Sequence, residues 1–437
     1  MSTTGHKLYL RAKAKIPGGT QLLSKRPEMF LPDQWPSYYS RARGVEVWDL
    51  DGHRYVDMGY NGIGACILGA ADPDVDEAVK KTIDAGSACT LNAPEEVELA
   101  DLLCQLHPWA HMVRYTRSGG EAMAVAVRIA RAHTRRDRVA FCGYHGWHDW
   151  YLAANLAEDR ALDGHLLPGL QPAGVPRGLA STALPFHYNQ FEELETIVAK
   201  YGDELAAIVM EPIRNHEPKP DFLEAIRELS SRIGAVLIFD EITSGFRFNT
   251  GGAHLLYNVQ PDVAVFAKAM SNGYPMAAII GRGDVMQAAQ ATFISSTNWT
   301  ERIGPVAALA TIHKHQHRQV PEHLKRIGML MQAGWHAAAA RSGLRLEIGG
   351  FAPLSHFHFV TEQHEAARTV FTQLMLERGF LASGAFYVTY AHQDHHLDSY
   401  FEALNEVFAV MAPALERNTI TTLLKGPVAH TGFQRLT

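Results

Sequence analysis

Between residues 75 and 315, short apolar runs alternate with segments of helical periodicity. The segments 121–133 and 222–233 repeat apolar residues at helical spacing, and Gly234 after the second is typical of a helix end. The runs LAAIVMEP, AVLIFDEI and DVAVFAK are apolar without alternation, so strands formed by them must be covered on both faces. This order predicts an α/β fold with a mostly parallel sheet between layers of helices.

The pattern changes after about residue 320, where helical segments accompany alternating strands such as LSHFHFV (354–360). Near the N-terminus, GVEVWDLDGHRYVDMG (44–59) predicts two short strands around an Asp-Gly turn. We therefore predict residues 75–320 as a large domain. Residues 1–74 and 321–437 are expected to form a smaller α+β domain together.

Charge and composition exclude several classes of partner. A formal net charge of −6 leaves no basic excess for nucleic acid. No apolar stretch approaches the roughly 20 residues that span a bilayer, and the N-terminal residues lack the apolar core of a secretion signal. The four cysteines have no metal-like spacing, which indicates reduced thiols. We expect a cytoplasmic protein.

Lys268 ends an apolar run within VAVFAKAMSNGYPMAA (263–278), just before a loop signal. Its stem can pack inside while the ammonium group reaches the surface. Alternatively, the amine is kept partly desolvated so that it acts as a nucleophile and forms a Schiff base. Ligands of open α/β sheets bind beyond the carboxyl ends of strands, where this lysine is expected.

Two other segments carry chemistry at predicted strand ends. TRSGGEAMAV leads Ser118, Gly119 and Gly120 into a helix, whose first N–H groups suit a phosphate, although Ser-Gly is also an ordinary cap. In CGYHGWHDWY, Tyr144 can stack on a flat heterocycle or pack on its own domain.

The strand in LIFDEITSGFR ends with Asp240 and Glu241. A carboxylate there needs a partner, which can be a helix cap, Arg247 or the protonated ring nitrogen of a cofactor. A phosphate cradle, an aromatic platform, a buried acid and a desolvated lysine are what pyridoxal phosphate (PLP) requires. We therefore predict PLP as the cofactor.

The same motifs, in the same order, resemble the class III aminotransferases of PLP fold type I, and most closely their glutamate-1-semialdehyde 2,1-aminomutase-like branch. SGGEA is similar to the family's Ser-Gly-Thr-Glu-Ala, YHGWHD to its Tyr-His-Gly loop, and FDEITSGFR to its Asp-Glu-Val-x-x-Gly-Phe-Arg. GGAHLLYNVQPDVAVFAKAMSNGYPMAAIIGR matches the lysine segment nearly end to end. The resemblance implies a large domain with a mostly parallel seven-stranded sheet and a smaller α+β domain.

The resemblance also implies roles for single residues. Lys268 would form the Schiff base and move the proton, Asp240 would pair with the pyridinium nitrogen, and Tyr144 and Ile242 would flank the ring. Gly120 lacks the hydroxyl that threonine usually gives to the phosphate. A threonine of the neighbouring subunit, Thr297 or Thr300, would complete that site in a homodimer. The implied cofactor-binding residues are Ser118, Gly119, Gly120, Tyr144, His145, Glu211, Asp240, Ile242, Lys268 and Thr297 or Thr300.

Departures from the family gather where the substrate would bind. The aminomutase's carboxylate-binding serine and arginine are replaced by Leu22 and Lys25, and IRNHEPKP introduces Arg214. Lys25, Arg26 and Arg214 are therefore predicted substrate contacts, although Arg214 can equally form a surface ion pair. An aminotransferase acting on another small acid, phosphorylated or sugar-like carbonyl is the first reading. A 2,1-aminomutase, an amino-acid racemase or epimerase, and a non-catalytic PLP-binding protein are the alternatives.

Two histidine-rich segments resemble metal sites, but we predict no metal. His145 and His148 are three residues apart without a supporting carboxylate or cysteine set. YAHQDHHLDSYFEAL (390–404) instead predicts a helix capped by Asp394 with apolar residues facing inward.

Overall fold

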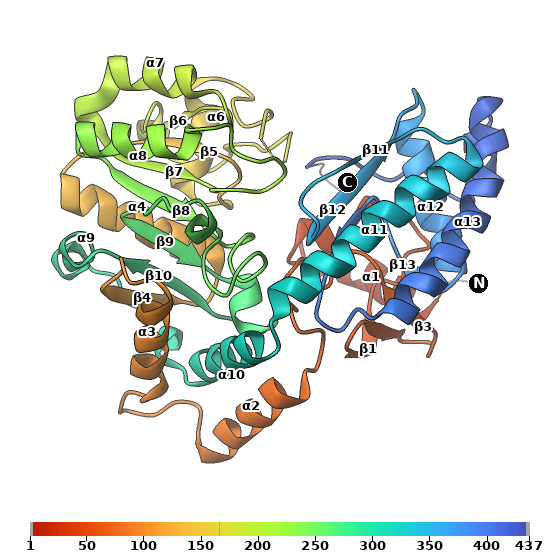
Figure 1. Ribbon diagram of the computed structural model, residues 1–437, viewed down its shortest axis with the longest axis horizontal. Coiled ribbons are helices and arrows are strands. Elements are labelled where there is room, and N and C mark those ends of the chain that lie inside the picture. Colours follow the sequence, from red (N-terminus) through yellow and green to blue (C-terminus); the bar gives the residue numbers. More distant parts are fainter. Residues whose placement is uncertain (1–2, 166, 434–437) are drawn as a thin grey trace. The chain divides into compact units, whose positions relative to one another are not determined.

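The structure is a computed structural model that describes residues 3–165 and 167–433. The chain divides into two compact units, Pro73–Pro321 and Met1–Asp72 with Glu322–Thr437. Each is described by itself (Figure 1). No helix in these described ranges is long and apolar enough to cross a membrane.

The unit Pro73–Pro321 alternates helices and strands. Its helices are α2 (Pro73–Ala85), α3 (Glu95–Leu106), α4 (Gly119–Thr134), α5 (Asp149–Leu152), α6 (Ala154–Ala157), α7 (Phe191–Tyr201), α8 (Phe222–Ile233), α9 (Gly283–Met286) and α10 (Ile303–His317). Its strands are β4 (Met112–Thr116), β5 (Arg138–Cys142), β6 (Ala183–Pro185), β7 (Leu205–Met210), β8 (Val236–Asp240), β9 (Val263–Phe266) and β10 (Ala277–Gly281).

These strands form one sheet in the order β4-β10-β9-β8-β7-β5-β6. The pairs β5/β6, β5/β7, β7/β8 and β8/β9 are parallel, and β10 is antiparallel to both of its neighbours. The predicted mostly parallel seven-stranded sheet is therefore confirmed.

Alternate residues of the central strands face two apolar layers. Val139, Phe141 and Ile238 pack in a cluster with the buried residues of α4. The residues between them along the strands face a second cluster, which includes Phe222, Ile226 and Leu229 of α8. Figure 1 shows α4 on one side of the sheet and α7 and α8 on the other. The predicted coverage of both faces is confirmed, as is the helix end at Gly234, which has φ +69°.

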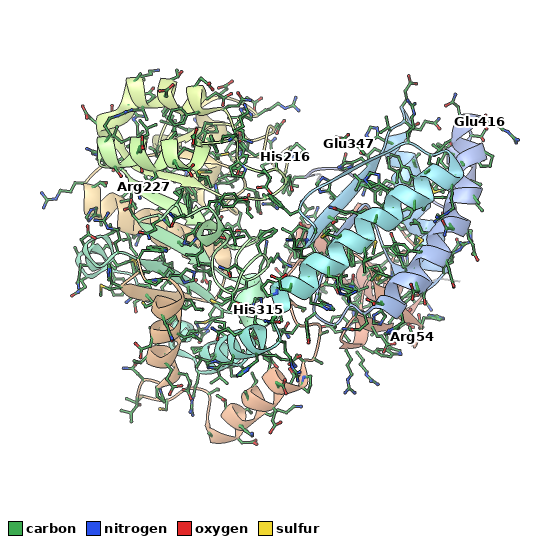
Figure 2. All side chains as sticks on the ribbon, in the orientation of Figure 1. Arg54, His216, Arg227, His315, Glu347 and Glu416 are labelled. Carbon is green, nitrogen blue, oxygen red and sulfur yellow. The ribbon has the colours of Figure 1, made fainter. Side chains whose placement is uncertain are left out.

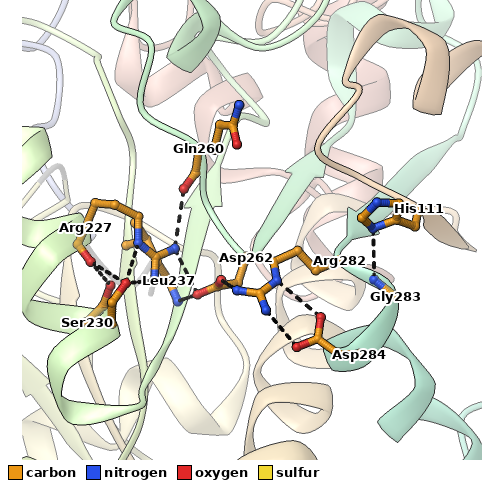
Figure 3. A network of polar contacts seen from close by, with 10 residues as sticks. His111, Arg227, Ser230, Leu237, Gln260, Asp262, Arg282, Gly283 and Asp284 are labelled. Atoms are coloured by element: carbon orange, nitrogen blue, oxygen red, sulfur yellow. Dashed lines mark hydrogen bonds and ion pairs between the residues drawn. The ribbon is translucent and has the colours of Figure 1, made fainter.

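The amino ends of β8 and β9 are joined by a buried acid, Asp262. It accepts a hydrogen bond from the Leu237 N–H at 2.8 Å and forms ion pairs with Arg227 at 3.0 Å and Arg282 at 2.9 Å (Figure 3). Because the charge has two cationic partners and a backbone donor, its burial is compensated. This network holds the strands at the edge opposite their carboxyl ends.

Histidine is also used structurally in α10. His315, labelled in Figure 2, lies 2.7 Å from the Phe246 carbonyl through Nε2 and 2.8 Å from Thr250 Oγ1 through Nδ1. Burial lowers the pKa of His315 to about 4, so the ring is neutral at physiological pH. It ties the segment that follows β8 to α10.

The second unit contains both chain ends. Its helices are α1 (Thr4–Lys13), α12 (His364–Glu377), α13 (Asp394–Glu416) and all but the first two residues of α11 (Val320–Ser342). Its strands are β1 (Tyr39–Arg43), β2 (Glu46–Asp49), β3 (Arg54–Asp57), β11 (Leu346–Gly349), β12 (Leu354–Phe359), β13 (Phe380–Leu381) and β14 (Ala385–Tyr387). They form two sheets, β1-β2-β3-β13 and β11-β12-β14. The predicted smaller α+β unit built from both terminal segments is confirmed.

The predicted cap of α13 is wrong. Asp394 is the first residue of the helix, and its carboxylate pairs with Arg326 at 2.8 Å. The helix starts after Gln393, whose N–H donates to His396 Nδ1 at 3.0 Å, so the chain turns one residue earlier than expected. His392 is structural, because its Nε2 donates to the Asp57 carbonyl and its Nδ1 accepts from the Thr389 N–H, both at 3.0 Å.

Candidate active site

The carboxyl ends of four neighbouring parallel strands bring the predicted residues to one edge of the sheet. Tyr144 follows β5, Glu211 follows β7, Asp240 ends β8 and Lys268 follows β9. Since β5, β7, β8 and β9 are adjacent and parallel, their carboxyl ends lie side by side. This is the edge at which open α/β sheets bind ligands.

Lys268 is partly buried and lies at the start of a short 3-10 helix, Lys268–Ser271. Its φ of +45° is in the left-handed region, which is uncommon for a residue with a side chain. Nζ donates to Thr243 Oγ1 at 2.9 Å. Burial, together with the positive charges of Arg214 and Arg247, lowers the pKa of Lys268 to about 8. A larger share of this amine is therefore neutral near physiological pH than of an exposed lysine.

This amine is expected to make the stability of the cofactor-free protein depend on pH. Below about pH 8 it is protonated in the folded and unfolded states, and the full penalty of the buried charge opposes folding. Between about pH 8 and 10.5 the folded state releases the proton first, so the free energy of unfolding rises with pH.

The variant Lys268→Met has no amine that can titrate in this pH range. At neutral pH we expect it to be more stable than the wild type by about 2 kcal/mol. This difference should shrink as the pH approaches 10.5. Urea unfolding of both proteins across this range measures it, and a difference that does not change with pH contradicts the prediction.

Asp240 is 3% exposed and is held from two sides. Its Oδ1 accepts a hydrogen bond from the Ile242 N–H at 3.0 Å, and its Oδ2 lies 2.7 Å from His145 Nδ1. His145 Nε2 lies 3.1 Å from the Cys142 carbonyl, which can only accept, so Nε2 carries a hydrogen. The contact between Nδ1 and Oδ2 fixes the orientation of the carboxylate.

The adjacent acid, Glu241, has a different environment. It is fully buried, accepts from His254 Nδ1 at 2.8 Å and from the His254 N–H at 2.9 Å, and also bonds the Ser244 hydroxyl. Burial alone would raise the pKa of Glu241, but the bonds from His254 and Ser244 lower it overall. Its partners are thus structural, and Arg247 instead donates through Nε to the Thr243 carbonyl at 2.9 Å.

Helix α4 begins at the predicted phosphate segment. Ser118 caps it, and the Ser118 hydroxyl is engaged with Glu121 in a capping box. A Cβ added to Gly119 would lie 2.8 Å from Ile242 Cδ1, so only glycine fits without displacing that side chain. The first N–H groups of a helix have no partner within it; the capping box uses that of Glu121, which leaves those of Gly119 and Gly120 suited to an anion.

Glu211 and Arg214 form an ion pair. Nη1 of Arg214 donates to both carboxylate oxygens, at 2.7 and 2.9 Å, and both side chains are largely buried. The charge of Arg214 also acts on Lys268 and on Tyr144. Arg214 therefore lies in the electrostatic neighbourhood of the lysine, and the ion pair of the alternative interpretation is present, although it is largely buried.

Other predicted residues have varied surroundings. Tyr144 is half-buried, and its ring meets Tyr151 edge to face at 5.9 Å between centroids. The pKa of Tyr144 is raised overall, because the effect of burial exceeds the opposing effect of the Arg214 charge. Thr297 and Thr300 are exposed at the two ends of a short 3-10 helix.

The three predicted substrate contacts are divided between the two units. Arg214 belongs to the unit Pro73–Pro321, whereas Lys25 and Arg26 belong to the other unit. Within the described part of the chain, no group of three or more His, Cys, Asp and Glu side chains is arranged to hold a metal ion.

Sequence reasoning missed two residues of this edge. Thr243 accepts the hydrogen bond of Lys268, and it lies three residues after Asp240, a spacing that could have drawn attention. His148 was considered only as a metal ligand, whereas its ring packs over Gly120. No spacing signal in the sequence indicates that contact.

The chain matches the family "Aminotransferase class-III" over residues 32–408. It is 32% identical to a 3-aminobutyryl-CoA aminotransferase of Cloacimonas acidaminovorans, over 92% of this chain and 96% of the relative. It is also 32% identical to a glutamate-1-semialdehyde 2,1-aminomutase of Desulforudis audaxviator, with the same coverage. The fold is similar to that of the Sphingopyxis FumI protein, solved in its PLP internal aldimine form, with a TM-score of 0.85 and 23% identity over 95% of this chain and 98% of that one.

These matches cover most of the chain, and they agree with the mostly parallel sheet and the smaller α+β unit. Membership of this family confirms the prediction of PLP as cofactor and of an aminotransferase that acts on a small amino donor and a carbonyl acceptor. The chain belongs to the class III aminotransferases, PLP-dependent enzymes of fold type I.

Proposed function

We propose that Lys268 is the residue that binds the cofactor's aldehyde and then moves a proton at the carbon that carries the substrate's amine. The partly desolvated amine at the end of β9, close to the charges of Asp240 and Glu211, is the observation that carries this assignment. A neutral amine is both the nucleophile and the base that this chemistry needs. Pyridoxal phosphate, when bound, supplies the electron sink for the charge left at that carbon.

The other predicted contacts keep their proposed roles. The buried carboxylate of Asp240, oriented by His145, is suited to pair with the ring nitrogen, and Tyr144 and Ile242 would flank the ring. Glu211 would lie at the cofactor's edge. The first-turn amides of α4 suit the phosphate. Glycine is required at position 119 because a side chain there would collide with Ile242. The Ser118 hydroxyl would have to leave Glu121 to contribute.

We propose a transfer reaction in which Arg214 binds the acidic part of the substrate. Lys25 and Arg26, which belong to the other unit, keep their proposed role as substrate contacts from the sequence alone. Arg214 offers a planar guanidinium close to the charge of Lys268. Since one relative is an aminotransferase of 3-aminobutyryl-CoA, an amine on the third carbon of an acyl group is the first donor class to test. The aminomutase alternative is supported by a relative of equal identity.

We also propose a cytoplasmic homodimer in which Thr297 or Thr300 of one subunit completes the phosphate site of the other. Both threonines are exposed. Large apolar side chains of the same unit are exposed as well, with Leu91 at 79% and Phe293 at 86%, as expected of a surface that is covered in an assembly. None of the four cysteines, all of them among the described residues, forms a disulfide, which fits a reducing compartment.

A screen of amino donors tests the proposed function. We expect the PLP-loaded protein, mixed with 3-aminobutyrate or a free α-amino acid and no acceptor, to release about one equivalent of carbonyl product per site. Mass spectrometry measures the product, and absorption follows the cofactor. If glutamate-1-semialdehyde alone reacts, and rearranges without releasing a carbonyl compound, the aminomutase is correct. A protein that neither retains PLP nor reacts with any of these compounds contradicts both.

A further inference from the structure

Position 120 is where this chain departs from the family's phosphate motif, because it carries glycine in place of threonine. The space of the missing side chain is filled. A Cβ built on Gly120 would lie 3.1 Å from His148 Cδ2 and 3.3 Å from His148 Nε2. A threonine there would therefore be crowded by the histidine ring, which lies over the first turn of α4.

The ring nitrogen that faces this turn lacks a protein partner. Nε2 of His148 is shielded from solvent and makes no hydrogen bond to any described residue. Leaving such a buried polar atom unpaired destabilises the folded protein. The atom is thus placed, at a cost in stability, beside the first-turn amides that suit an anion.

The ring is also held in place from behind. His148 caps the short helix α5, and its carbonyl accepts from the N–H groups of Tyr151 and Leu152 at 2.9 and 3.1 Å. Its ring stacks on Trp147, with 4.3 Å between centroids and an interplanar angle of 23°. A donor that is already oriented loses little freedom when a ligand binds.

We propose that Nε2–H of His148 replaces the family's threonine hydroxyl as a donor to the cofactor's phosphate. The inference rests on the proposed function, because it requires PLP at the start of α4. A hydrogen bond to a charged acceptor is among the stronger ones, and the pair Gly120–His148 then works as a unit: the small residue makes room for the ring, and the ring restores the donor.

Equilibrium binding of PLP and of pyridoxal, which lacks the phosphate, tests this role without measuring turnover. We expect His148→Ala to weaken PLP binding roughly 10- to 100-fold. The affinity of this variant for pyridoxal should stay within about twofold of that of the wild type, because pyridoxal has no phosphate for His148 to contact. His148→Gln, which keeps an N–H donor, should recover part of the loss. His133 is exposed in the last turn of α4, the helix that begins at Gly119. His133→Ala is therefore the control and should bind both ligands with wild-type affinity.

A swap of the two positions sharpens the test. Gly120→Thr alone should bind PLP poorly, because the new side chain meets the ring. The double variant Gly120→Thr/His148→Ala restores the family's arrangement and should regain PLP affinity. The proposal is overturned if His148→Ala binds PLP like the wild type, or if it weakens PLP and pyridoxal equally. A wild type that binds no PLP, or binds it equally well without Lys268, instead overturns the proposed function.

Discussion

Replacing Lys268 with alanine will lower the rate of amino transfer by at least ~10³-fold, because one amine is proposed to serve as both nucleophile and base. The visible absorption band of the lysine-bound cofactor should be lost as well. Steady-state kinetics with a donor found in the screen, and a spectrum of the purified variant, measure the two effects.

Two comparisons separate chemistry from folding in this prediction. Lys268→Arg keeps a positive charge but stays protonated, so it should be as inactive as the alanine variant. A small primary amine added to Lys268→Ala should restore part of the rate, because it supplies the missing base in a space the side chain has left. A variant that keeps a tenth or more of the wild-type rate without added amine is incompatible with the assignment.

Asp240→Asn will lower kcat roughly 10²- to 10³-fold, the loss typical of removing one preorganised electrostatic contact. The amide is nearly the same size, but it carries no charge with which to keep a cofactor's ring nitrogen protonated. It also leaves His145 Nδ1 beside a neutral group. Kinetics of the PLP-saturated variant measure the effect, and Asp240→Glu should retain more activity than the asparagine variant.

Asp262 provides the matched control. It is a buried aspartate like Asp240, with exposures of 4% and 3%, but it lies at the amino end of β9 in the network of Figure 3. Asp262→Asn should lower the free energy of unfolding, because two arginines lose their acid, while kcat of the folded enzyme stays within about twofold of the wild type. Equal losses of kcat in both variants would mean that Asp240 acts only through stability.

The architecture of the sheet could be predicted because its information is local. Apolar runs without alternation require cover on both faces, and the helical spacing in α4 and α8 supplies that cover. Gly234 marked a helix end by its conformational freedom. The predicted cap of α13 was wrong because Gln393 and Asp394 are adjacent and both polar, so the sequence leaves the start of the helix ambiguous by one residue.

The edge of the sheet could be predicted, but the pairing of its residues could not. Strand ends indicated Asp240 and Lys268, whereas the contact of Asp240 with His145 joins residues 95 positions apart. For Glu241, the sequence offered Arg247 as a partner, but the structure supplies His254 and Ser244. Such choices depend on how loops pack after the strands have formed, and neither periodicity nor spacing records that.

The backbone of Lys268 has a consequence for directed evolution. The residue is doubly unfavourable for folding, with φ at +45° and an amine stripped of water. Glycine or asparagine would adopt the positive φ more readily, and any neutral residue would avoid burying a charge. A library of the cofactor-free protein screened for heat resistance alone should therefore discard this lysine early, so thermostable variants of this enzyme need to be selected for turnover at the same time.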